Sequence, residues 1–214
     1  MKKISIFVFA ALLLFMPGCG LLTLHPIFTP GELIFDNRLQ GKWKAGGGYT
    51  EFEPATKVAM DEIPEKLRPF VNKFYLCTRR SDDGSTGSRD LAFLVKIGNN
   101  YFIDMYPLQT EETKRLDEFF SSHELKMHTI SKLEFTNRNI KLTGFKDNYV
   151  EDLIKNREVR IRHSFVSSPD ESDKEKKIVI TASTKELQAF LLKYGDRKEA
   201  YDNNEDHNTY RKIN

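Results

Sequence analysis

Short runs of apolar and polar residues alternate along most of the chain, which is the pattern of half-buried β-strands. Nine such runs lie at residues 39–45, 49–53, 70–80, 91–97, 99–107, 129–135, 140–145, 159–166 and 177–181. The connections at Gly46-Gly47-Gly48, Gly98-Asn99-Asn100 and Asn137-Arg138-Asn139 have the composition of hairpin turns. Residues 81–90 (SDDGSTGSRD) have the composition of a loop.

Three other segments, 110–120, 147–156 and 183–195, repeat their apolar residues at helical spacing. In the last one, Ser183 and Glu186 have the spacing of a capping box, and the apolar residues that follow form one stripe: Leu187, Phe190, Leu191 and Tyr194. An isolated helix of this length is marginal in water, so we expect the stripe to cover the sheet as a lid or plug.

Hairpins interleaved with helices predict an α+β fold that is mainly antiparallel β. We expect a lipocalin-like barrel, or a strongly curved sheet of about 8–9 strands, with three helices. Closure into a barrel would remove the exposed edges of the sheet.

The first 18 residues have the pattern of a secretory signal peptide. Lys2 and Lys3 precede a 13-residue apolar run at 4–16, and a membrane-spanning helix needs about 20 apolar residues. Gly18-Cys19 resembles the bacterial lipobox, which implies that Cys19 carries diacylglycerol and palmitate and anchors the protein to a membrane. An ordinary signal peptide cleaved later, or an uncleaved anchor, remains as an alternative.

These features divide the chain into four parts. We expect a signal peptide at 1–18, a lipidated N-terminus with a short tether at 19–38, a single β-rich domain at 39–195, and a polar, frayed tail at 196–214. Because the segment at 19–38 is apolar, we expect either that the domain lies close to the bilayer or that this segment packs onto the domain. If the source is a Gram-negative bacterium, Gly20 after the cysteine favours the outer membrane, by the sorting habit of lipoproteins.

Composition excludes two classes of protein. The chain has 33 Lys+Arg and 31 Asp+Glu, and 39% of its residues are hydrophobic, which is ordinary for a globular protein. Removal of Lys2 and Lys3 with the signal peptide leaves 31 basic and 31 acidic residues (33 − 2 = 31), so bulk electrostatics do not predict a nucleic-acid partner. Two cysteines do not build a disulfide scaffold.

The residues that could carry chemistry favour no catalytic or metal site. His123 and His128 are five positions apart, which separates them by about 140° on a helix, whereas the zinc motif HExxH needs a spacing of four. Cys77 lies in a strand-like run and is most simply a small buried hydrophobic residue. Asp104 interrupts an apolar strand, and it is either a polar group of a pocket, a solvent-facing residue, or a cap for a backbone group.

Two segments of the chain resemble known families. Gly41-Lys42-Trp43 resembles the G-x-W signature of lipocalins, in which the tryptophan packs across the closed end of an eight-stranded calyx. The residues 25–43, 94–107 and 180–195 together resemble a group of uncharacterised bacterial envelope lipoproteins. That resemblance implies a β-rich, lipocalin-like domain and supplies no catalytic residue.

We therefore expect a membrane-tethered, non-enzymatic envelope protein without a cofactor. Its partner is an apolar small molecule or another envelope component, and the residues expected in a pocket or core are Trp43, Asp104, Phe190 and Tyr194. The alternatives are a hydrolase that acts on an envelope substrate and a structural assembly partner.

Overall fold

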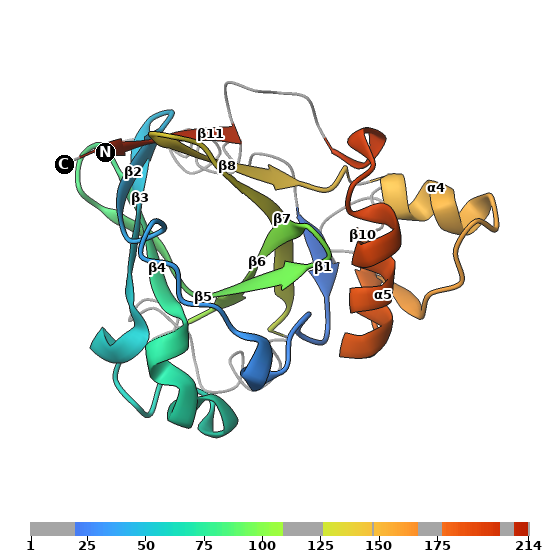
Figure 1. Ribbon diagram of the computed structural model, residues 1–214, viewed down its shortest axis with the longest axis horizontal. Helices are drawn as coiled ribbons and strands as arrows, with labels where there is room; N and C mark the ends of the chain where they lie inside the picture. Colours follow the sequence, from blue (N-terminus) through green and yellow to red (C-terminus); the bar gives the residue numbers. More distant parts are fainter. Residues whose placement is uncertain (1–19, 109–125, 147, 167–176, 202–207, 214) are drawn as a thin grey trace, which may run out of the picture.

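The computed structural model describes residues 20–108, 126–146, 148–166, 177–201 and 208–213. Its centre is a closed antiparallel barrel (Figure 1). The barrel strands are β2 (Gly41–Ala45), β3 (Gly48–Pro54), β4 (Tyr75–Ser81), β5 (Thr86–Ile97), β6 (Asn100–Pro107), β7 (His128–Phe135), β8 (Asn139–Gly144) and β11 (Thr209–Ile213). β6 pairs with β7, and β11 lies between β2 and β8, so the ring has no free edge. The predicted lipocalin-like barrel is confirmed.

All nine predicted runs contain a strand, and the described residues add two that were not predicted: β1 (Leu21–Thr23) and β11. The prediction of a frayed tail is wrong for β11, which closes the barrel and places Lys212 opposite Trp43. Three of its five residues are polar or charged, and its two apolar residues are three positions apart, so its sequence lacks the alternation that marks a half-buried strand.

Of the two arrangements expected for the segment at 19–38, its described part has the one in which the segment packs onto the domain. Leu21, Ile27, Phe28 and Leu33 are buried, and β1 pairs with β7 beyond the end of β8. The segment is apolar because it packs on the barrel.

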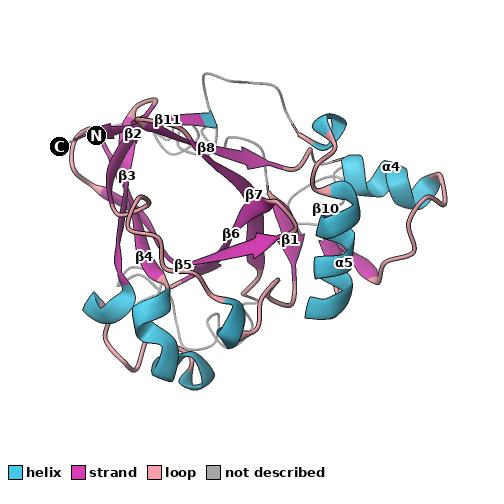
Figure 2. Cartoon of the chain, in the orientation of Figure 1, coloured by secondary structure: helices cyan, strands magenta, loops and turns pink. Residues whose placement is uncertain are grey.

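β1 also connects the barrel to a small sheet outside it. β1 runs parallel to β10 (Lys177–Ile180), which pairs with β9 (His163–Val166). Helices α4 (Tyr149–Lys155) and α5 (Thr184–Tyr194) lie on the same side of the barrel (Figure 1). Short 3-10 helices occupy Pro30–Glu32, Ala55–Lys57, Glu65–Lys73 and Lys198–Ala200 (Figure 2). The predicted helix at 110–120 lies outside the described residues.

Helix α5 has the predicted capping box, in which Ser183 and Glu186 bind each other's backbone amides. Its stripe is buried, as expected, but it covers the outer wall of the barrel and does not plug the lumen. The helix packs over an N-terminal strap, residues 24–32, because Thr184 donates to the carbonyl of Pro26 (2.8 Å) and Gln188 to that of Ile27 (2.9 Å).

Alternate residues of the barrel strands therefore enter two separate cores. Phe93, Phe102 and Ile130 face outward and pack against the strap and α5. Their neighbours face inward and form the lumen core: Leu39, Trp43, Phe52, Tyr75, Cys77, Ala92, Leu94, Ile103, Met105, Leu133 and Ile140.

Candidate functional site

One end of the barrel is closed by the segment that precedes β2. Ile34 donates its backbone N–H to the carbonyl of Leu94 (2.9 Å), and Phe35 stacks on Tyr75 with ring centroids 4.7 Å apart. Trp43 is 3% exposed, and its indole N–H donates to the carbonyl of Leu39 (2.8 Å). The tryptophan therefore packs at the closed end, where the G-x-W resemblance places it.

Apolar side chains fill the lumen next to this end. Phe52, Tyr75, Leu94 and Ile103 are each exposed by 1% or less. The lumen next to this end is therefore closely packed.

The opposite end of the lumen carries charge. Arg79 lies two residues beyond the inward-facing Cys77 on β4, so it faces inward as well, and it pairs with Ser88 on β5. One guanidinium nitrogen of Arg79 lies 3.2 Å from Ser88 Oγ and 3.5 Å from Asp90 Oδ2, and the other lies 3.4 Å from Met105 Sδ. Four side chains from three strands thus meet at this opening.

Arg79 is accessible and desolvated at the same time. Its side chain is 46% exposed. The pKa of Arg79 is nevertheless raised above its ordinary value. Partial desolvation by the surrounding protein lowers this pKa, but the nearby groups of Cys77, Asp90 and Tyr210 raise it by more. Tyr210 belongs to β11, on the far side of the ring from β6, where Met105 lies. Arg79 is therefore accessible to solvent while protein groups lie close to it on several sides.

Asp90 and Cys77, which lie beside Arg79, are more deeply buried than Arg79 is. Asp90 is 8% exposed, and its burial raises its pKa while Arg79 and Ser88 lower it. Burial also raises the pKa of the Cys77 thiol to about 12. Cys77 is therefore a thiol at neutral pH, and it is unsuited to nucleophilic catalysis.

Asp104 is fully buried on the outer wall, on the opposite face of β6 from Met105. Its Oδ1 lies 2.6 Å from His128 Nδ1, and its Oδ2 accepts the backbone N–H of Ile27 (3.0 Å). Burial raises the pKa of Asp104, and the bonds from His128 and Ile27 act in the opposite direction. Of the three roles open from the sequence, Asp104 has that of a backbone cap, and it pins the strap to the barrel.

The other residues expected in a pocket or core do not converge on one site. Phe190 and Tyr194 are buried on α5, with ring centroids 5.1 Å apart, and they pack in the core outside the barrel. Trp43 belongs to the lumen core. Cys19 and His123 lie outside the described residues.

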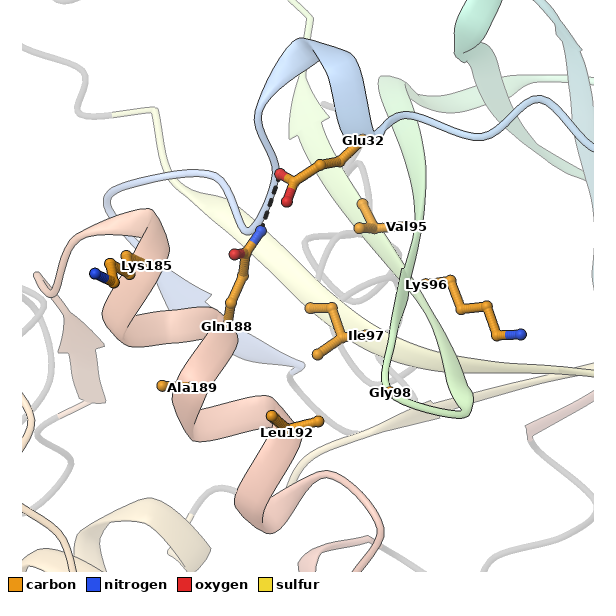
Figure 3. Close-up of a pocket in the computed structure, with 9 residues that line it drawn as sticks. All are labelled: Glu32, Val95, Lys96, Ile97, Gly98, Lys185, Gln188, Ala189 and Leu192. Carbon is orange, nitrogen blue, oxygen red and sulfur yellow. Dashed lines mark hydrogen bonds between the residues drawn. The ribbon is translucent and has the colours of Figure 1, made fainter.

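A hollow lies between α5 and the β5–β6 hairpin (Figure 3). It is a groove of about 290 Å³, open to solvent, and a hydrogen bond from Gln188 to Glu32 (3.0 Å) spans one end of it. Leu192 at its rim is 64% exposed. Its residues are Glu32, Val95, Lys96, Ile97, Gly98, Lys185, Gln188, Ala189 and Leu192.

The charged opening does not follow from the sequence pattern. The composition of residues 81–90 predicts a loop, but β5 begins at Thr86 and carries Ser88 and Asp90 into the lumen. Ser88 and Asp90 are two positions apart, so on a strand they share one face, and the preceding strand ends in Arg79-Arg80. This pattern is the signal in the sequence that could have indicated the charged cluster.

Within the part of the chain that the structure describes, no cluster of three or more His, Cys, Asp or Glu residues could hold a metal ion. The described helices are all too short or too polar to cross a membrane. Comparisons with protein-family models, curated proteins and solved structures find no match for this chain.

Proposed function

We propose that this protein is a lipid-anchored lipoprotein of the bacterial cell envelope whose barrel binds a small molecule at its open end, without catalysis. The observation that carries the binding function is Arg79, an inward-facing side chain that is 46% exposed in the mouth of an otherwise filled barrel. Holding a charge inside a barrel costs free energy, and a bound ligand of opposite charge would offset that cost.

The N-terminal sequence supports a lipid anchor at Cys19, and the fold sets how far the barrel lies from that anchor. β1 begins at Leu21, two residues after Cys19. Two residues span at most about 7 Å, so a lipid on Cys19 would hold the barrel directly at the bilayer surface.

A hydrolase is the weaker alternative. Asp104 and His128 form an acid–histidine pair, but both carboxylate oxygens of Asp104 are occupied in holding His128 and the strap. Among the described residues, no hydroxyl or thiol that would act as a nucleophile hydrogen-bonds to His128.

The anchor is tested by Cys19→Ser in the native host. Intact-mass spectrometry and membrane fractionation should show loss of the lipid mass and of the cleaved, membrane-bound form. A Ser variant that is cleaved and fractionates like the wild type would refute the lipoprotein assignment.

Binding is tested by titrating the purified full chain, in a nonionic detergent, with eight-carbon amphiphiles. Saturable heat at a stoichiometry near one supports a lumen site. Heats that match the detergent blank for every amphiphile would refute it.

A further inference from the structure

We propose that Arg79 binds the anionic group of this ligand, a carboxylate or a phosphate monoester carried on a short apolar chain. This inference rests on the proposed function, because it names the class of small molecule that the mouth of the barrel takes. It assigns a role to a residue that the sequence pattern leaves without one.

The guanidinium group of Arg79 has unused hydrogen-bonding capacity. It carries five N–H donors in a fixed fork that matches a carboxylate or a phosphate. Among the described residues its partners are a hydroxyl at 3.2 Å, a thioether at 3.4 Å and the Asp90 carboxylate at 3.5 Å. A thioether is a weak acceptor, and 3.5 Å is long for a charge-assisted hydrogen bond. The fork thus retains capacity for a strong, bidentate acceptor.

The surroundings of that fork favour an anion with an apolar chain. Met105 and Cys77 are buried apolar neighbours on β6 and β4, and partly desolvated Arg79 interacts with an anion more strongly than a solvated surface arginine does. An apolar chain would reach only the edge of Met105, which is 7% exposed, because the lumen beyond it is filled, and the proposed chain is therefore short. Asp90 competes with the ligand for the same guanidinium and so limits its affinity.

Arg80 provides a matched control on the same strand. It is the next residue of β4 and pairs in regular register with Tyr49 of β3, so it faces away from the lumen, and its Nη1 donates to Thr86 Oγ1 (2.7 Å). Arg79→Gln and Arg80→Gln remove the same charge from neighbouring positions, one inside the barrel and one outside.

The experiment compares octanoate, octyl phosphate and 1-octanol by isothermal titration calorimetry, with the full chain of each variant in the same nonionic detergent. Partition of the probes into micelles is common to all variants. We expect Arg79→Gln to weaken both anions by about tenfold or more, the loss of one charge-assisted interaction, with octanol unchanged. Arg80→Gln should stay within about twofold of the wild type, and Asp90→Asn should tighten both anions.

The outcomes separate this inference from the function on which it rests. The tighter of the two anions identifies the head group. Equal affinity of the wild type for octanol and for both anions, with no change in Arg79→Gln, would overturn the inference and leave small-molecule binding intact. Saturable binding of none of the three probes would overturn both. If Arg79→Gln melts below the wild type, Arg79→Lys keeps the charge without the fork and should still lose affinity.

Discussion

Asp104→Asn should destabilise the protein through the strap that crosses the outer wall. The carboxylate is 0% exposed and joins two segments that are distant in sequence, since its Ile27 bond spans 77 residues. The amide of asparagine has the same shape and keeps one acceptor oxygen for the N–H of Ile27, but its NH₂ group then faces His128 Nδ1 and requires the imidazole tautomer in which Nδ1 accepts. No solvent reaches the site to compensate that donor.

The magnitude follows from these two bonds. A hydrogen bond to a charged group contributes about 1.5–3 kcal/mol, and a buried polar group left without its partner costs about 1–3 kcal/mol. Because asparagine retains one of the two bonds, we expect Asp104→Asn to lower the free energy of unfolding by about 2–3 kcal/mol. Asp104→Ala, which retains neither bond, should lower the free energy of unfolding further than Asp104→Asn does.

Urea unfolding followed by Trp43 fluorescence measures this loss, with an unchanged m-value as the check on two-state behaviour. Asp82→Asn is the control, because Asp82 pairs with Lys44 at 3.3 Å on the surface with its side chain 58% exposed. That substitution should change stability by less than about 1 kcal/mol. If Asp104→Asn and Asp82→Asn were equally mild, the strap would not depend on Asp104 and its assigned role would be wrong.

Three further outcomes are expected. Phe190→Ala should cost about 3–5 kcal/mol in urea unfolding and Ser183→Ala about 1 kcal/mol; equal small losses would mean that the α5 stripe is not core. Cys77 should stay unreactive towards a thiol reagent at neutral pH until the protein unfolds, since its pKa is about 12 and it is buried; prompt labelling of the native protein would contradict this. The folded-state pKa of Glu186 is lowered to about 2 by its bonds to Ser183 and Arg162, so its stabilising effect is present above its ordinary pKa of 4.5 and is lost as the pH falls towards 2. Glu186→Gln should therefore be less stable than wild type at pH 7, and the difference should vanish in acid.

The strands of the barrel are predictable where one face is apolar and where the connecting turns contain residues, such as glycine, that hairpin turns require. Gly46 and Gly98 adopt φ of 59° and 60° in the β2–β3 and β5–β6 hairpins, a conformation that glycine reaches without strain. The capping box of α5 is equally local, because it depends on residues three positions apart.

The elements that close the fold are not predictable from local patterns, because their partners are far away in sequence. β11 is mostly polar and becomes a strand only between β2 and β8. Asp104 stands out in its strand, but its partners are His128 on β7 and Ile27 on the strap, which no local pattern connects. The charged opening is different, because Arg79, Ser88 and Asp90 lie on the two strands of one hairpin. It stays hidden because residues 81–90 have the composition of a loop, and only Met105 comes from a third strand.

The most direct test of small-molecule binding at the barrel mouth is an NMR titration of the ¹³C-methyl methionine-labelled full chain with octyl phosphate. We predict a saturable shift of the Met105 methyl signal, which lies against Arg79, and no shift of Met60, which is 49% exposed on the surface. The Met105 shift should disappear in Arg79→Gln and persist in Arg80→Gln. Saturation without any change at Met105 would place the ligand elsewhere and contradict the assignment of the open end of the barrel as the binding site.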